Sequence, residues 1–260
     1  MRDQRLQEME KTIQEAGTIS MEELRLRFDV SMHTVRRDVA ELEKRGLAEK
    51  VYGGVTAAAG PRGQLLDFPE RSGMNAEGKQ ECCRAAAELV QDHDVIFVDS
   101  GTTLSFLPEY LAGKKDVILV THNLHLIREA VPYENLQIIA LPGRLRRKTL
   151  SLTGAETVAA LQTYNIRKAF MATTGTTERT VTNSSPEEFE VKRTAMRVIP
   201  ERILLLTGEK FGHPGLMNYA SFSEFQTIVT DRLPEEPYLA ELRESGARIV
   251  AADAMTKERE

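Results

Sequence analysis

Seven short apolar runs alternate with amphipathic stretches over residues 81–252, and this alternation constrains the fold more than any other feature of the sequence. The runs are Val95–Val98, Val117–Val120, Leu136–Leu141, Ala169–Met171, Ile203–Leu206, Thr227–Val229 and Ile249–Val250. Most are continuously apolar, as expected for strands buried on both faces of a parallel sheet. Helix-like segments lie between them at 81–91, 104–112, 124–131, 155–163 and 187–198. The pattern predicts an open α/β sheet with helices on both sides.

Composition agrees with a globular protein, because 41% hydrophobic residues can fill a core. No apolar run approaches the ~18 residues of a membrane-spanning helix, and the charged N-terminus lacks the apolar stretch of a signal peptide. We therefore expect a cytoplasmic protein. The net charge of −5 argues against a surface that is basic throughout but leaves room for a local basic patch. The adjacent Cys82 and Cys83 match no metal-ligand spacing and are expected to be packing residues rather than a redox pair.

Residues 1–56 are typical of three short helices followed by a hairpin. Ser20 and Glu23 form a capping-box pattern at the start of the second helix, and Ser31 is the expected N-cap of the third. The stretch 47–55, with Gly53-Gly54 at its centre, predicts two short strands around a tight turn, which would be a wing.

The third helix has an apolar face and a cationic face. Val35, Val39 and Leu42 share the buried side at helical spacing. The opposite side carries His33, Arg37, Ala40 and Lys44, flanked by Thr34 and Arg36. A recognition helix uses such a surface to meet base edges and phosphates in the major groove. An ordinary helical bundle remains the alternative, because residues 1–55 hold ten Lys/Arg against eleven Asp/Glu.

The run Asp99-Ser100-Gly101-Thr102-Thr103 directly follows the strand at 95–98 and opens a helix-like segment. Ligands of open α/β sheets bind outside the carboxyl ends of the strands, and small residues with backbone N–H groups at a helix start favour phosphate. A plain strand-to-helix turn is the alternative. Polar or small residues also follow other strands, at 121–123, 142–144, 172–175 and 207–210. Their convergence at one sheet edge favours a ligand site.

Glu188 and Lys192 are four residues apart on a predicted helix. Taken alone, this spacing is typical of an exposed ion pair that stabilises the helix by about 0.3–0.5 kcal/mol.

The N-terminal part resembles the deoxyribose-operon-repressor (DeoR) family of transcriptional regulators. The resemblance rests on the run at 30–39, which contains Thr34-Val35-Arg36-Arg37-Asp38, on the run at 42–47, and on Tyr52-Gly53-Gly54-Val55. Tyr52 stands where His is commoner in the family. The predicted DNA contacts are Ser31, His33, Thr34, Arg36, Arg37, Lys44, Lys50 and Tyr52, with Lys50 on the phosphate backbone.

The later part resembles the sensor domain of the same family. The resemblance rests on Lys79, the run at 99–103, Asn123, Pro142-Gly143, Gly175, Glu188 with Val191-Lys192-Arg193, and Lys210-Phe211-Gly212. Thr207 departs from the family, which usually has Asp there. The resemblance implies an open sheet like those of ribose-5-phosphate isomerase and CoA-transferases, which binds a phosphorylated sugar or polyol. The implied ligand contacts are Asp99, Ser100, Gly101, Thr102, Thr103, Asn123, Gly143, Gly175, Lys192 and Lys210.

The sequence thus predicts a winged helix-turn-helix domain at 1–56, a partly ordered linker at 57–80 and an α/β sensor domain at 81–260. The expected function is a transcriptional repressor of sugar or polyol catabolism that acts as a homo-oligomer on double-stranded operator DNA. A sugar-phosphate isomerase with a DNA-binding appendage is the alternative, although no nucleophile–base pair or metal constellation is visible, and no cofactor is expected. A sensor that has lost its ligand is a third possibility. Gly101→Val is expected to block the anion and leave most of the core intact.

Overall fold

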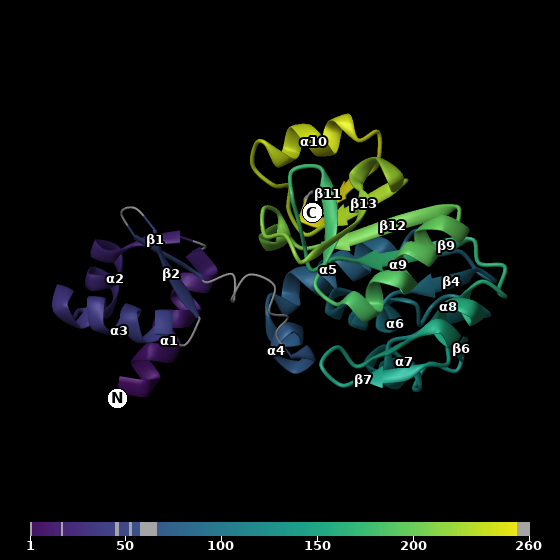
Figure 1. The fold of residues 1–260 in the computed structure, drawn as a ribbon, viewed down its shortest axis with the longest axis horizontal. Helices are drawn as coiled ribbons and strands as arrows, with labels where there is room; N and C mark the ends of the chain where they lie inside the picture. Colours follow the sequence, from purple (N-terminus) through teal and green to yellow (C-terminus); the bar gives the residue numbers. More distant parts are fainter. Residues whose placement is uncertain (1, 17, 45–46, 52–53, 58–66, 254–260) are drawn as a thin grey trace. The chain divides into compact units, whose positions relative to one another are not determined.

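The structure, a computed structural model, describes residues 2–16, 18–44, 47–51, 54–57 and 67–253. The chain divides into two compact units, Met1–Gln64 and Leu65–Glu260 (Figure 1). The second unit begins well before residue 81, where the sequence placed the sensor domain. The reason is that Phe68 and Lys79 are buried in this unit.

The first unit is a three-helix domain with a small antiparallel sheet. Its elements are α1 (Arg2–Ala16), β1 (Thr18–Ser20), α2 (Met21–Phe28), α3 (Met32–Lys44), β2 (Ala48–Val51) and β3 (Gly54–Ala57). The predicted capping box is confirmed, because Glu23 N donates to Ser20 Oγ at 3.1 Å and Ser20 N donates to Glu23 Oε2 at 3.0 Å. The predicted hairpin is also confirmed as β2 and β3, and β1 joins it in the order β1-β3-β2.

An ion pair between helices supports the apolar core of this unit. Val35, Val39 and Leu42 of α3 are buried in that core, as predicted. The neighbouring Asp38 is fully buried as well, and Arg5 of α1 donates to its Oδ2 from Nε at 2.8 Å. A buried carboxylate is tolerated only when it is paired, so Arg5 and Asp38 fix α1 against α3.

The second unit is built on one seven-stranded parallel sheet. The strands are β4 (Val95–Val98), β5 (Val117–Thr121), β6 (Leu136–Ala140), β9 (Lys168–Ala172), β12 (Glu201–Leu206), β14 (Thr227–Thr230) and β15 (Arg248–Ala251). They lie in the order β15-β14-β12-β9-β4-β5-β6, and every neighbouring pair is parallel. The seven apolar runs of the sequence are these seven strands.

Helices cover both faces of this sheet, as predicted (Figure 1). One face packs against α5 (Ala76–Ala87), the 3-10 helix η1 (Thr102–Phe106), α6 (Leu107–Tyr110) and α7 (Leu124–Ala130). The other packs against α8 (Ala155–Leu161), α9 (Pro186–Val198) and α10 (Tyr238–Glu244). Sheet positions alternate between two buried clusters, which explains why the strands are apolar at almost every residue.

Several features of this unit were not predicted, and α10 is one of them. Helix α4 (Phe68–Gly73) forms within the stretch expected to be a linker, and α5 begins at Ala76 rather than at 81. A hairpin of β7 (Arg144–Arg146) and β8 (Ser151–Thr153) follows β6. A small sheet of β10 (Gly175–Thr176), β11 (Thr180–Asn183) and β13 (Met217–Ser221) lies outside the main sheet.

Among the described residues, no helix has the length and the hydropathy that crossing a membrane requires. The same residues contain no group of three or more His, Cys, Asp or Glu side chains arranged to hold a metal ion.

Candidate functional site

The order of the strands places a topological switch point between β4 and β9. From β4 the chain moves outward to β5 and β6, then returns to β9 on the other side of β4 and continues to β12, β14 and β15. In open α/β sheets, ligands bind in the crevice outside the carboxyl ends of the strands at such a point. Here the residues at this crevice are Asp99, after β4, and Ala172, at the end of β9.

Asp99 is the centre of a buried polar network at the switch point. Its Oδ2 accepts a hydrogen bond from Ala172 N at 3.0 Å and forms an ion pair with Lys192 of α9. Its Oδ1 lies 3.2 Å from His122 Nε2. Burial alone would raise the pKa of Asp99, but the charge of Lys192 and the contact with His122 outweigh it and hold the pKa below its usual value. The Asp99 carboxylate is therefore ionised and fixed in position.

Lys192 is held at three points. Besides the ion pair, its Nζ donates to Ala172 O at 2.9 Å and lies 5.2 Å from the centre of the Tyr219 ring. The hydroxyl of Tyr219 donates to the same carbonyl at 2.9 Å. The structure thus brings the predicted Asp99 and Lys192 together and adds His122 and Tyr219, which the sequence did not single out.

The expectation of an exposed Glu188–Lys192 pair is wrong. Both side chains are buried, and Lys192 pairs with Asp99 instead. Glu188 Oε1 accepts hydrogen bonds from Ser100 Oγ at 2.8 Å and from Ser151 Oγ at 2.7 Å. The physical reason is that α9 lies against the sheet edge, so the face carrying both residues points into the protein. Glu188, which was not among the predicted ligand contacts, thus joins the site, and Ser151 is a further member that sequence reasoning missed.

Gly101 is required by packing inside the protein. A Cβ at this position would lie 2.0 Å from the Cβ of Ala172, far inside van der Waals contact. The expectation that Gly101→Val spares the core is therefore wrong. Thr102 and Thr103 follow in η1 and are buried, and Lys210 donates from Nζ to Thr103 Oγ1 at 2.8 Å. Lys210, at the end of the 3-10 helix η2 (Gly208–Lys210), thus joins the predicted loop.

The other three predicted ligand residues have structural roles. Asn123 is fully buried and caps α7, with its Oδ1 accepting from His125 N at 3.0 Å and from Leu126 N at 3.2 Å. Gly143 lies after β6 with φ +151°, and Gly175 packs so closely that a Cβ would lie 1.7 Å from His213 O. Gly143 is exposed in the turn before the β7–β8 hairpin.

The amide nitrogen of Asn123 has a property of its own. Its Nδ2 is buried, and the described residues supply it with no hydrogen-bond partner. Because an unpaired buried donor costs about 1–3 kcal/mol, this atom is suited to a ligand oxygen.

Three cations lie beside the predicted loop, and two of them were not predicted as ligand contacts. Lys79 of α5 is buried and donates from Nζ to Arg71 O and, at 3.5 Å, to Ser72 O of α4. Arg71 and Lys210 are half-buried and close enough to Lys79 to act on its charge. Burial and the charge of Lys210 lower the pKa of Lys79 to about 7. The resemblance pointed to Lys79, but only the fold places Lys79 and Arg71 at the loop.

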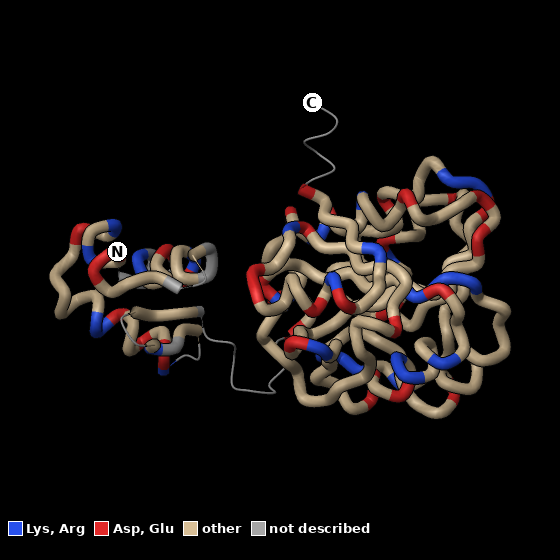
Figure 2. The backbone as a smooth tube through the Cα atoms, turned by 90° about the horizontal axis from the view of Figure 1, so that it is seen from above, with Lys and Arg blue, Asp and Glu red and all other residues tan. Residues whose placement is uncertain are grey.

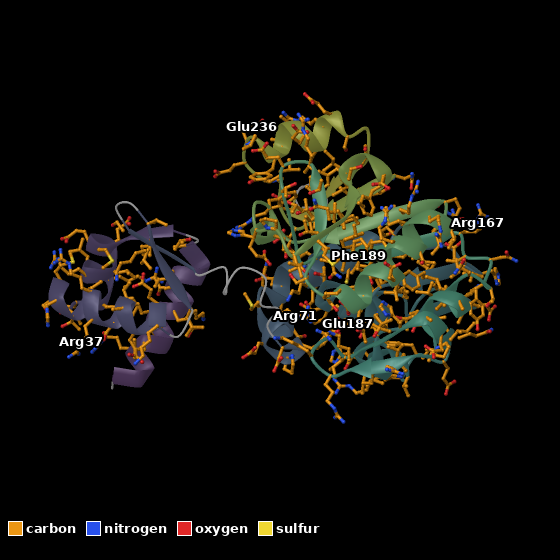
Figure 3. All side chains as sticks on the ribbon, viewed as in Figure 1. Arg37, Arg71, Arg167, Glu187, Phe189 and Glu236 are labelled. Atoms are coloured by element: carbon orange, nitrogen blue, oxygen red, sulfur yellow. The ribbon has the colours of Figure 1, made fainter. Side chains whose placement is uncertain are left out.

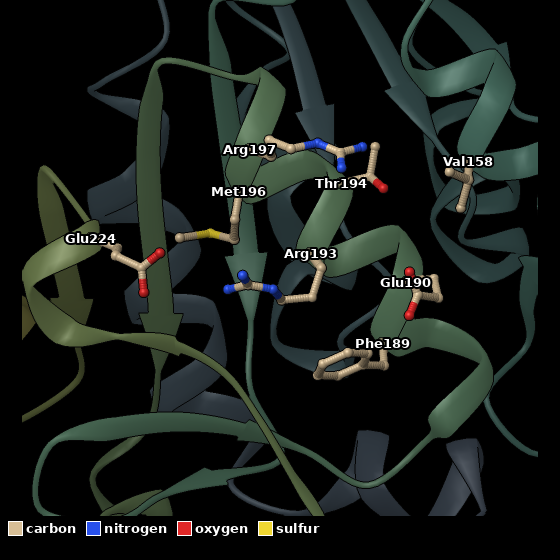
Figure 4. Close-up of a pocket in the computed structure, with 8 residues that line it drawn as sticks. All are labelled: Val158, Phe189, Glu190, Arg193, Thr194, Met196, Arg197 and Glu224. Atoms are coloured by element: carbon tan, nitrogen blue, oxygen red, sulfur yellow. The ribbon is translucent and has the colours of Figure 1, made fainter.

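A surface groove of about 470 Å³ lies elsewhere, on the outer side of α9 (Figure 4). Its lining residues are Val158, Phe189, Glu190, Arg193, Thr194, Met196, Arg197 and Glu224. None of them was predicted to bind ligand, and none belongs to the Asp99 network.

In the first unit, the predicted face of α3 is exposed. His33, Arg36, Arg37 and Lys44 all face solvent, and Arg37 lies at the periphery of the unit (Figure 3). Charges of both signs are interspersed along the backbone of each unit (Figure 2). Exposed basic residues of this unit also lie outside α3, at Lys11, Arg27 and Lys50, so the face of α3 is one of several basic positions.

Three further predicted DNA contacts, Ser31, Thr34 and Lys50, have partners within the protein. Ser31 Oγ accepts from Thr34 N at 3.2 Å, as an N-cap does, and lies 2.9 Å from Thr34 Oγ1. Lys50 of the wing donates to Glu43 Oε2 at 2.7 Å. Tyr52 lies outside the described residues.

Two family matches cover most of the chain. Residues 5–59 match the DeoR-like helix-turn-helix domain, and residues 74–232 match the DeoR C terminal sensor domain. The HTH-type transcriptional regulator IolR of Bacillus subtilis is 38% identical over 92% of this chain and 94% of its own length. The lactose phosphotransferase system repressor of Streptococcus mutans is 29% identical over 88% and 92%. Among solved structures, a D-ribose-5-phosphate isomerase in complex with phospho-erythronic acid aligns over 53% of this chain and 55% of its own, with 13% identity and a TM-score of 0.40.

Proposed function

The chain belongs to the DeoR family of DNA-binding transcriptional regulators, and from that premise we propose that it represses an operon for sugar or polyol catabolism under the control of a phosphorylated sugar or polyol. The observation that carries the effector half of this proposal is the buried network at the β4–β9 switch point. Fixed hydrogen-bonding groups at such a point suit a small polar ligand. In this arrangement Asp99, Asn123 and Lys192 face the hydroxyls of the effector, and the loop at 100–103 faces its phosphate.

The DNA half of the proposal rests on α3 and the wing. The exposed side of α3 offers two arginines, a histidine and a lysine to the major groove, which is the arrangement a recognition helix uses. On DNA, Lys50 exchanges its ion pair with Glu43 for a backbone phosphate. Such exposed pairs are worth less than about 1 kcal/mol, so the exchange meets little resistance.

One experiment tests both the effector half and the DNA half of the proposal. Operator DNA is first selected from a random duplex library with the full-length protein. Release or strengthening of the complex is then titrated with pentose, hexose and polyol phosphates and with their unphosphorylated parents. The proposal expects at least one phosphate to shift operator affinity while its parent does not. Equal action of parent and phosphate would show that the phosphate is not what the sensor recognises.

An isomerase is the second candidate, but the family and the named relatives are transcriptional regulators. The network also favours binding over chemistry, because both oxygens of Asp99 already have partners. Incubation of the protein with the same phosphates, followed by product analysis, distinguishes the two. Turnover supports an enzyme, whereas saturable binding without turnover supports a sensor.

We further propose that the protein is a homo-oligomer, with α9 of the second unit at the contact between copies. Glu190 and Arg197 lie seven residues apart on the exposed stripe of α9, with Arg193 between them. In a two-fold antiparallel pair of these helices, Glu190 of each copy meets Arg197 of the other. A second copy is therefore a complementary occupant for this face (Figure 4).

A further inference from the structure

Arg71, Lys79 and Lys210 come from three separate elements and meet beside η1. The packing of α5 explains this, because Cys83 Sγ donates to Thr103 O at 2.9 Å and Cys82 Sγ donates to Leu206 O at 3.6 Å. These contacts hold α5 against η1 and the end of β12, so that Lys79, one turn earlier, lies close to Lys210. We refer to Arg71, Lys79 and Lys210 as the cation cluster.

Two members of the cation cluster, Lys79 and Lys210, hydrogen-bond to uncharged oxygens. Lys79 Nζ donates to two backbone carbonyls of α4, and Lys210 Nζ donates to the hydroxyl of Thr103. The nearby Glu209 is exposed and accepts from Asn75 Nδ2 at 2.8 Å and from Thr207 Oγ1 at 2.5 Å. Desolvation and mutual repulsion lower the pKa of Lys79 and of Lys210. Sheltered cations that repel each other are stabilised by an anion.

Helix α4 forms one wall of this cluster. Phe68 is buried against the ring of His125, with centroids 4.8 Å apart, and its N donates to Lys148 O at 3.0 Å. The guanidinium carbon of Arg71 lies 5.6 Å from the centre of the Phe68 ring. Arg71 is also close enough to Glu188 for that carboxylate to act on its charge. Within the cation cluster, Arg71 is thus the member whose charge interacts with Glu188 of the Ser100–Glu188–Ser151 group.

The position of α4 in the sequence links the contacts of Arg71 to the DNA-binding unit. Helix α4 is the first described element of the second unit, and the chain that precedes it leads to the DNA-binding unit. A ligand that holds α4 more firmly thus acts on the segment that tethers the DNA-binding unit. Such a ligand shifts the equilibrium between two states only if it binds one of them more tightly.

We propose that the anionic group of the effector docks in the cation cluster beside Thr103, and that through Arg71 it fixes α4, so that occupancy of the sensor is transmitted to the DNA-binding unit through this helix. This inference rests on the proposed function and adds to it a phosphate subsite and a route of communication. Thr103 and Lys210 supply the sheet side of the subsite. Arg71 and Lys79 supply the α4 side.

The test uses amide hydrogen exchange of the full-length protein with inorganic phosphate as the probe and potassium chloride at equal ionic strength as the reference. Phosphate is expected to slow exchange of residues 67–79 and to leave residues 190–197 of α9 unchanged. Lys79→Met and Arg71→Gln should each weaken this protection by about tenfold in phosphate concentration, the loss expected for one charge-assisted hydrogen bond. Arg243→Gln, on α10, removes an exposed charge elsewhere and serves as the matched control.

The outcomes separate this inference from the proposed function. Phosphate that protects α4 in the wild type but not in the variants supports the inference, and absence of protection in the wild type overturns it. Unchanged protection in both variants also overturns it. If a sugar phosphate acts on the operator complex equally in wild type and Arg71→Gln, the proposed function stands and the inference fails. Thermal unfolding checks that the variants fold. Should Lys79→Met fail to fold, Arg71→Gln decides alone, because Arg71 is only half-buried.

Discussion

Lys79 is a buried lysine whose ammonium group donates to two carbonyl oxygens and lies near two further cations and the carboxylate of Glu209. Its pKa of about 7 in the folded protein lies below the ordinary value of 10.5. Below pH 7 the lysine is charged in both states, and the folded state bears the full cost of burying the charge. Between pH 7 and 10.5 only the unfolded state keeps the proton, so stability rises with pH by at most about 1.4 kcal/mol per unit.

The substitution Lys79→Met tests whether the lowered pKa of Lys79 makes stability rise with pH. The difference in free energy of unfolding between wild type and variant, measured by urea titration, should move in favour of the wild type as pH rises from 7 to 10. Other titrating groups are common to both proteins and cancel in the difference. Curves that stay parallel over this range would show that Lys79 remains charged in the folded protein.

Gly101 and Ala172 form the tightest contact at the switch point, and this contact predicts a rescue. Gly101→Ala should destabilise the second unit by about 1–3 kcal/mol, the usual cost of overpacking. Ala172→Gly removes the opposing Cβ, so the double variant should recover part of that loss beyond the sum of the two single effects. Thermal unfolding of the four proteins measures the interaction. Strict additivity would mean that the backbone moves apart and that the contact is unimportant.

At this residue scale the sequence located only part of the site. Asp99, Thr103, Lys192 and Lys210 were predicted because they follow strands or match a family pattern, and the structure brings them to one sheet edge. The sequence could not reveal that Lys192 pairs with Asp99 rather than with Glu188, because helical spacing does not show which side of α9 faces the protein. Ser151 and His122 escaped notice for a similar reason. Their partners, Glu188 and Asp99, are distant in the chain.

At the scale of elements, the strongest test concerns the exposed face of α3. Arg37→Ala should weaken operator binding by about 1–3 kcal/mol if Arg37 contacts a base edge, and His33→Ala should change sequence preference. Arg37 is 55% exposed in its side chain, so its removal is expected to leave the fold intact. Titration at fixed salt with Arg243→Ala as a charge-matched control measures the effect. Unchanged affinity of Arg37→Ala would mean that another surface of the unit reads DNA.

The elements that the sequence predicted are those with a strong apolar period. All seven strands of the main sheet were predicted because each is a short, mostly apolar run, and α3 because its buried residues recur at helical spacing. Strands such as β7, β8 and β11 are short and rich in Arg or Thr. They form because neighbouring backbone groups pair with them, and no local pattern records that. Helix α4 was missed because its one fully buried anchor, Phe68, gives no period at all.

At the scale of the whole molecule, a two-fold operator calls for a two-fold protein, because one small winged helix offers limited contact with DNA and paired half-sites add their binding energy. In the second unit, α9 presents a face of charged and apolar residues around a groove. The two ends of that face carry opposite charges, because Glu190 lies toward one end of α9 and Arg197 toward the other. A face of this kind pairs with its own copy only when the two helices run antiparallel.

Charge reversal tests this arrangement. In the antiparallel dimer, Arg197→Glu places a glutamate opposite Glu190 of the other copy at both symmetry-related contacts. The repulsion should raise the dimer dissociation constant by about tenfold or more. The double variant Glu190→Arg, Arg197→Glu restores opposite charges in every pair and should return the constant toward that of the wild type. Sedimentation at micromolar concentration, with Arg243→Glu as control, measures both. A wild type that sediments as a monomer with and without DNA refutes the oligomer. A wild-type dimer that Arg197→Glu leaves unchanged places the interface on another face of the sensor, because a like-charge contact repeated twice by symmetry cannot be silent at an interface that contains it.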